Sequence, residues 1–144
     1  MKLSPNFTLE EFLVSEVGAR SGIDNTPDDE VIDNLRVLAS TLQAIRIHLQ
    51  HPIVITSGYR CPELNRLVGG ADTSAHLRGW AADFTCPGYG PPLAVARAIT
   101  YQWGVRGDQL IHEFGSWVHL SVDPRMRRQM LTIDRRGTRQ GLQP

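Results

Sequence analysis

Residues 74–83 read SAHLRGWAAD, and this stretch decides how the rest of the sequence is interpreted. It places an imidazole, His76, seven residues before a carboxylate, Asp83. The alternation from Trp80 to Phe84 predicts a strand with these two aromatic residues on one face and Asp83 on the other. A carboxylate that points inward from a strand needs a cationic partner, because a buried unpaired charge is very costly. Asp83 therefore requires either a metal ion shared with His76 or a buried arginine.

A second alternating stretch, WVHLSV at residues 117–122, decides between these two partners. It predicts a strand that carries His119. One aspartate and two histidines from distant segments form a three-ligand set, which leaves a fourth coordination position for water. Such a set is typical of catalytic rather than structural zinc. We therefore expect one zinc ion, held by His76, Asp83 and His119.

A longer pattern runs through both stretches, with Ser74-x-His76-x-x-Gly79-x-Ala81-x-Asp83 followed by Glu113 and by Trp117-Val118-His119. This pattern resembles the zinc D-Ala-D-Ala carboxypeptidase family, the LAS metallopeptidases, from about Phe7 to Val122. The family shares its fold with vancomycin-resistance dipeptidases, phage L-Ala-D-Glu endolysins and the Hedgehog signalling domain. The resemblance implies an α+β fold of the Hedgehog/D-Ala-D-Ala-peptidase type. In it, helices pack against a mainly antiparallel sheet with the zinc site on one face.

The resemblance also suggests roles for two residues outside the ligand set. The segment Ser57-Gly58-Tyr59-Arg60 corresponds to one that delivers an arginine to the active site of the family. There, Arg60 would bind the substrate and donate to the oxyanion that develops in the transition state. A surface arginine paired with a neighbour is the alternative. Ser74 would hydrogen-bond the substrate, and capping of the local turn is its alternative.

Glu113 is the candidate general base, because a metallohydrolase needs a carboxylate near its metal-bound water. Residues 109–114 and 117–121 predict a hairpin whose loop length fixes the position of Glu113. A two-residue loop would place His112 opposite His119. A three-residue loop, from Gly115 to Trp117, would place Glu113 opposite His119 on the same face. We predict the odd-numbered loop, or a bulge with the same effect.

Relatives in the resembled family differ in this region. Some members carry the catalytic acid three residues before the last histidine ligand, where this chain has Ser116. The Hedgehog-like arrangement has a glutamate six residues before it, as Glu113 is here. Many members also have a histidine two residues before that ligand, where this chain has Trp117. Trp117 therefore replaces a histidine that is a candidate for stabilising the transition state in those members.

Local signals predict the remaining elements. Thr8 and Glu11 form a capping box, and Thr26 with Pro27 predicts the start of a long helix that Pro52 ends near residues 50–51. We expect a buried strand at 52–57, a short helix at 62–66, and a helix from Pro91 or Pro92 to about Trp103, ended by Gly104. The long helix has one apolar stripe, formed by Val31, Leu35, Leu38, Leu42, Ile45 and Leu49.

The composition of the 144 residues is that of one globular domain, with 41% hydrophobic and 21% charged residues. A formal net charge of zero predicts no nucleic-acid or membrane partner, and no apolar run approaches the ~20 residues of a membrane span. We expect a monomer. The start, MKLSPNFTLEEF, lacks the apolar core of a signal peptide. Without export, Cys61 and Cys86 are expected to be reduced thiols, although a disulfide between them is the alternative.

We assign residues 1–124 to a zinc peptidase domain and residues 125–144 to a basic tail that is partly ordered at most. A short strand at 130–134 is expected within it, with a loose chain from Gly137. The arginines of this tail either bind anionic wall polymers or form an ordinary solvated surface.

The resemblance implies that the chain hydrolyses amide bonds of peptidoglycan stem peptides. The bond would be of the D-Ala-D-Ala carboxypeptidase type or the L-Ala-D-Glu endopeptidase type, cut during phage lysis or cell-wall remodelling. Lacking a signal, the protein would stay in the cytoplasm until release, or be carried by a virion, and act on the cell wall. The alternative is a zinc-containing binding module, or a virion structural module, of the same fold without catalysis.

Overall fold

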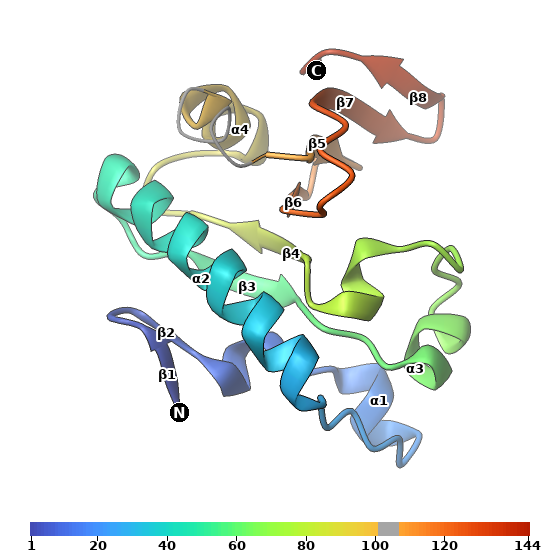
Figure 1. The fold of residues 1–144 in the computed structure, drawn as a ribbon. Helices are drawn as coiled ribbons and strands as arrows, with labels where there is room; N and C mark the ends of the chain where they lie inside the picture. Colours follow the sequence, from blue (N-terminus) through green and yellow to red (C-terminus); the bar gives the residue numbers. More distant parts are fainter. Residues whose placement is uncertain (101–106) are drawn as a thin grey trace.

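A six-stranded sheet forms the centre of the protein in the computed structural model, which describes residues 1–100 and 107–144. The strand order is β3-β4-β6-β5-β7-β8, and every neighbouring pair is antiparallel except β5 and β7 (Figure 1). The expected α+β architecture with a mainly antiparallel sheet is therefore confirmed. Its strands are β3 (Val54–Ser57), β4 (Ala81–Thr85), β5 (Gln109–Glu113), β6 (Trp117–Ser121), β7 (Gln129–Asp134) and β8 (Gly137–Gln140).

The longest helix is α2 (Asp29–Leu49), which crosses in front of β3 and β4 in the view of Figure 1. The Asp28 carboxylate caps its start by accepting from the Val31 N–H at 2.9 Å. The expected Thr26 cap is wrong, because the Thr26 hydroxyl instead donates to Asp24 at 2.6 Å, in the turn before the helix. Gln50 ends the helix in the left-handed conformation, as expected from Pro52.

One face of the sheet and the apolar stripe of α2 share a single core. All six stripe residues are buried, and Phe84, Leu110 and Leu120 of the sheet are fully buried in the same cluster. Helix α4 (Pro92–Ala98) also contributes, through Val95 and Ala96. Because side chains alternate along a strand, Asp83 and His119 are left on the opposite face.

Short elements complete the N-terminal half. Strands β1 (Lys2–Ser4) and β2 (Phe7–Thr8) form a separate two-stranded sheet. The capping box of Thr8 and Glu11 is confirmed, although it opens a single 3-10 turn, η1 (Leu9–Phe12). Helices α1 (Glu16–Arg20) and α3 (Pro62–Leu67) follow, and a second 3-10 turn, η2 (Ala75–Arg78), precedes β4.

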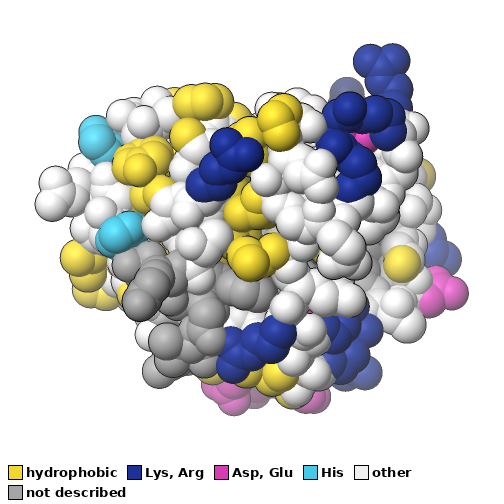
Figure 2. Space-filling view, turned by 90° about the horizontal axis from the view of Figure 1, so that it is seen from above, with side chains coloured by type: hydrophobic (Ala, Val, Ile, Leu, Met, Phe, Trp, Pro, Cys, Tyr) yellow, Lys and Arg dark blue, Asp and Glu magenta, His cyan; other side chains and the backbone are white. Residues whose placement is uncertain are grey.

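The C-terminal segment is more ordered than expected. The strand expected at 130–134 is confirmed as β7, but the chain from Gly137 is not loose, because it forms β8 against β7. Residue 124 therefore marks no break in the sheet. Lys and Arg side chains gather in several groups on the side of the molecule seen from above (Figure 2).

Three further expectations can be compared with the structure. Strand β3 is an edge strand with Val54 49% exposed, so the expectation of a buried strand is wrong. Cys61 and Cys86 are free thiols, as expected. Helix α4 begins at Pro92, whereas its expected end at Trp103 and Gly104 lies outside the described residues. None of the helices in the described ranges is long and apolar enough to cross a membrane.

Candidate metal centre

His76, Asp83 and His119 meet on the face of the sheet opposite the core. Asp83 and His119 are direct partners across β4 and β6, and His76 lies on η2, the turn that leads into β4. The Asp83 Oδ1 atom is 2.8 Å from His119 Nδ1 and 3.4 Å from His76 Nε2. One ligand atom from each residue lies within 4.8 Å of the other two, so the three could hold a metal ion.

The hydrogen bond of His76 determines which ring nitrogen can act as a ligand. Its Nδ1 atom is 2.7 Å from the carbonyl oxygen of Gly58, which can only accept, so Nδ1 carries the proton. The Nε2 atom of the neutral ring then directs a lone pair at Asp83, which also offers only lone pairs. A cation between these acceptors would resolve their repulsion, and a backbone carbonyl on the other ring nitrogen is the usual support of a metal-binding histidine.

The shifts in pKa agree with this assignment of protons. Burial lowers the pKa of His76, and the opposing effect of Asp83 is smaller, so the neutral ring is favoured. For His119, burial also lowers the pKa, but the hydrogen bond to Asp83 outweighs it and leaves the pKa raised. Burial raises the pKa of Asp83, but the hydrogen bond from His119 and the proximity of both imidazoles outweigh this and leave the pKa well below its usual range.

The alternative partner for Asp83, a buried arginine, is not found among the described residues. The ion pairs of Asp83 in residues 1–100 and 107–144 are with His76 and His119 only. Arg60 is near enough for Asp83 to raise its pKa, but burial has the larger effect and leaves the Arg60 pKa lowered.

Glu113 lies beside this cluster, although not in the register that we expected. The loop is odd-numbered, as predicted, but it spans residues 114–116 rather than 115–117. Ile111 is therefore directly opposite His119, and Glu113 is opposite Trp117. Glu113 still lies on the face of the sheet that carries His119. Glu113 Oε1 still lies 3.8 Å from His119 Nδ1. Burial raises the pKa of Glu113, with His119 opposing and Asp83 adding to the shift, which favours proton uptake.

Arg60 and Ser74 also reach the site. The Arg60 side chain donates to Ser74 Oγ at 3.5 Å, and its backbone N–H donates to the carbonyl of His76 at 3.1 Å. Ser74 Oγ accepts from the His76 N–H at 3.2 Å, so the serine caps η2 and thereby helps to position His76. This capping contact is the structural alternative noted for Ser74, and it leaves the hydroxyl beside Arg60.

Two buried donors in the site have no hydrogen-bond partner within residues 1–100 and 107–144. They are the Nε atom of Arg60 and the indole Nε1 atom of Trp117. The indole faces Glu113 and helps to lower the pKa of that carboxyl, although it makes no well-formed hydrogen bond to it. Unpaired buried donors are rare and favour a site that receives an acceptor-rich ligand.

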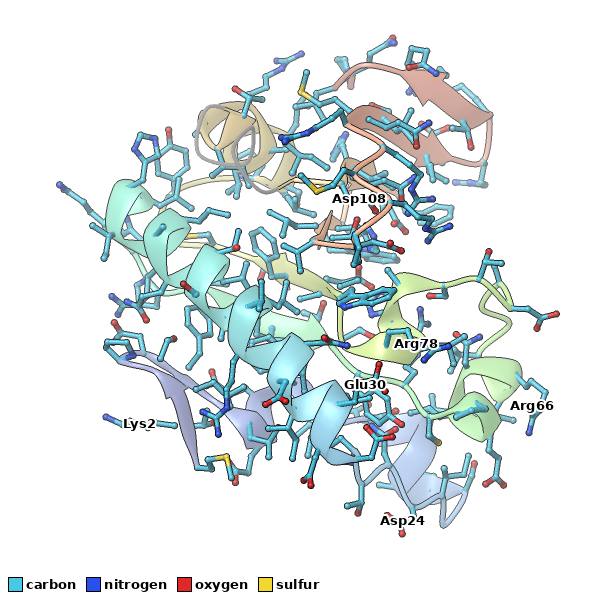
Figure 3. The ribbon with its side chains drawn as sticks, viewed as in Figure 1. Lys2, Asp24, Glu30, Arg66, Arg78 and Asp108 are labelled. Atoms are coloured by element: carbon cyan, nitrogen blue, oxygen red, sulfur yellow. The ribbon has the colours of Figure 1, made fainter. Side chains whose placement is uncertain are left out.

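These residues line one cavity of about 330 Å³, whose wall also includes two arginines that the sequence did not bring forward. Arg125 and Arg127 belong to the segment treated as a tail, yet both reach the cavity wall. The partner of Arg127, Asp108, lies 19 residues away in the sequence and comes beside it only when the sheet has formed, whereas the partner of Arg125 is the nearby Asp123. Asp108, labelled in Figure 3, lies among the packed side chains near β5 and β6.

Comparison with known proteins gives one family. A family model described as peptidase M15 matches residues 5–121, which include every residue of the pattern from Ser74 to His119. A comparison with curated proteins finds no match.

Proposed function

The chain belongs to the peptidase M15 family, and from this premise we propose that it is a zinc-dependent peptidase of peptidoglycan stem peptides. The family implies a hydrolase that cleaves peptide bonds. The observation that supports the metal is the arrangement of His76 and Asp83. A neutral imidazole nitrogen and a carboxylate face each other at 3.4 Å, with His119 completing the set.

The three donor atoms suit zinc. Two imidazole nitrogens and one carboxylate oxygen form a common catalytic ligand set, with a position left for water or substrate. When bound, zinc would lower the pKa of its water to about 7 and polarise the scissile carbonyl.

Glu113 is the proposed general base and acid. Its carboxylate lies next to His119, in a buried position that raises its pKa towards the range in which proton transfer is efficient. In this role Glu113 accepts a proton from the attacking water on Oε1 or Oε2 and later donates it to the leaving amine. The nearby indole N–H of Trp117 favours the ionised carboxylate, which is the form that accepts the first proton and that is restored when the proton is donated.

Arg60 is the proposed donor to the substrate. Arg60 lines the cavity, its buried Nε–H has no partner among the described residues, and its Nη2 atom contacts Ser74. A guanidinium held in this way donates to charge that grows on the substrate oxygen in the transition state. We propose that Ser74 supports this contact and adds a hydroxyl for the bound peptide.

The proposed substrate is a stem peptide, cut at a D-Ala-D-Ala-type or an L-Ala-D-Glu-type bond. Purified peptidoglycan incubated with the zinc-loaded protein tests this, with the released fragments read by mass. We expect fragments with the wild type and none after chelation or with Glu113→Ala. Absence of fragments from a zinc-loaded, folded protein would contradict the proposal and favour a binding module of the same fold. The fragment masses also identify the bond.

A further inference from the structure

Among the residues that the structure describes, three arginines reach the cavity, and the proposed mechanism uses only Arg60. The other two, Arg125 and Arg127, come from the segment between β6 and β7, beyond the residues matched by the family model. Their side chains are 43% and 30% exposed, so they are accessible from solvent.

Arg127 is held rigidly from behind. Its Nε and Nη2 atoms donate to the two oxygens of Asp108 at 2.9 and 2.7 Å, and its backbone N–H donates to the same carboxylate at 2.8 Å. Asp108 is fully buried and also accepts from the Ser121 hydroxyl. A bidentate pair of this kind fixes the plane of the guanidinium, which lowers the entropic cost of binding an anion.

Arg125 is also held by a buried carboxylate. Its Nε and Nη2 atoms contact the buried Asp123 at 2.8 and 2.6 Å, and Nη2 also donates to the carbonyl of Thr73 at 3.2 Å. The last contact ties the segment after β6 to the loop that leads into Ser74. Arg125 therefore connects two walls of the cavity.

Both pairs present positive charge to the cavity. The side chains of Asp108 and Asp123 are 0% and 3% exposed and lie behind the more exposed guanidinium groups. The Nη1 atoms of Arg125 and Arg127 donate no hydrogen bond that we observe within residues 1–100 and 107–144. These N–H groups remain for a ligand.

The strand register places the Arg127 guanidinium and Glu113 on opposite sides of His119 along β6. Arg127 is anchored next to Ser121, two residues after His119 on β6, whereas Glu113 pairs with Trp117, two residues before His119. Two residues of a strand span about 7 Å. An extended peptide advances about 3.5 Å per residue, so a group within about two residues of the scissile carbonyl can reach the arginines.

We propose that Arg125 and Arg127 form a subsite for a carboxylate of the peptide substrate, within about two residues of the scissile bond. This inference rests on the proposed peptidase function. The carboxylate is either the C-terminal carboxylate of the substrate peptide or the free α-carboxylate of a γ-linked D-Glu within it. The subsite makes the enzyme selective for acidic over amidated stem peptides.

Matched peptides test the subsite and distinguish the two sources. One pair is acetyl-L-Lys-D-Ala-D-Ala with a free or an amidated C-terminus, and the other is L-Ala-γ-D-Glu-L-Lys with a free or an amidated D-Glu. The zinc-loaded wild type is expected to prefer the free acid of one pair by about ten- to a hundredfold in kcat/KM, the usual strength of hydrogen bonds between charged groups.

Paired substitutions avoid leaving a buried acid without its partner. In Arg127→Gln/Asp108→Asn and Arg125→Gln/Asp123→Asn, the preference should fall to within a few-fold of one. The control is Arg136→Gln/Asp134→Asn, an ion pair of the same kind outside the cavity, which should keep the full preference. Equal use of acid and amide by the wild type, or an unchanged preference in both cavity variants, overturns the subsite.

A binding measurement separates failure of the subsite from failure of the peptidase function. The same four peptides are titrated into the zinc-loaded protein by calorimetry. Tighter binding of the acids without hydrolysis supports the subsite and contradicts the peptidase function. Hydrolysis of acid and amide at equal rates supports the function and contradicts the subsite.

Discussion

Two carboxylates beside the same cavity have partners of different chemistry. Asp83 faces two imidazoles, whereas Asp108 faces the guanidinium of Arg127. An imidazole can lose its proton and offer a lone pair to a metal, but a guanidinium keeps its proton at every physiological pH. The Asp83 cluster can therefore exchange a proton for a metal ion, while the Asp108 pair remains a fixed ion pair. The basicity of the partner, more than the burial of the acid, distinguishes a candidate metal centre from a structural contact.

The largest expected effect is at Asp83. Asp83→Asn should reduce the zinc content of the purified protein to background and lower peptide hydrolysis by about a thousandfold or more, since several kcal/mol of charge stabilisation are lost. Elemental analysis and a fragment-release assay measure both. Asp108→Asn is the matched control and should retain its zinc. Stoichiometric zinc in Asp83→Asn would remove the distinction between the two acids.

Glu113→Gln should lower kcat by about 10²- to 10⁴-fold, because the isosteric amide cannot accept the proton of the attacking water. Its zinc content should match that of the wild type, which separates proton transfer from metal binding. His112→Gln changes the neighbouring residue, whose side chain points to the other face of the sheet, and should have little effect on kcat. A wild-type rate in Glu113→Gln would exclude it as the base.

Asp108→Asn should lower the free energy of unfolding by roughly 2–3 kcal/mol, below the range for a fully buried pair because Arg127 is 30% exposed. Denaturant unfolding of the metal-free protein measures it. The double variant Asp108→Asn/Arg127→Gln should recover part of the loss, since no charge then lacks a partner. Unchanged stability in Asp108→Asn would show that the ion pair contributes nothing.

The smallest expected effect is a dependence on acid pH. Burial raises the pKa of Asp108, but the hydrogen bonds from Arg127 and Ser121 outweigh this and leave the pKa below its usual value. A lowered pKa in the folded state contributes stability above the unfolded pKa of about 3.9, and this is lost as the pH falls through the folded value. Between pH 5 and pH 3, wild-type stability should therefore fall more steeply than that of Asp108→Asn/Arg127→Gln. Parallel curves would contradict this.

The sequence predicts those features that depend on local periodicity. The stripe of α2, the faces of β4 and the hairpin that carries His119 all follow from residue spacing, so the Asp83 cluster could be anticipated. The loop could not be placed, because Phe114 adopts a left-handed conformation (φ 52°) that is uncommon for a residue other than glycine. Because Phe114 and Gly115 are both left-handed, the turn begins at Phe114. Glu113 therefore pairs with Trp117 and not, as we expected, with His119.

Pairings between distant segments explain the other differences. Arg127 could not be connected with Asp108 from the sequence, because the contact exists only after β7 has joined the sheet beside β5. The same pairing orders the segment that looked like a loose tail. Thr26 and Asp28 are both acceptable caps, and the choice between them depends on the turn that Asp24 forms with Thr26.

The parallel pairing of β7 with β5 has a consequence for any shortened form of the protein. A fragment that stopped at residue 121, where the family match ends, would leave one side of β5 with its backbone N–H and C=O groups unpaired. Exposed strand edges of this kind recruit other chains. The residues after position 121 thus cover this side of β5, in addition to supplying Arg125 and Arg127.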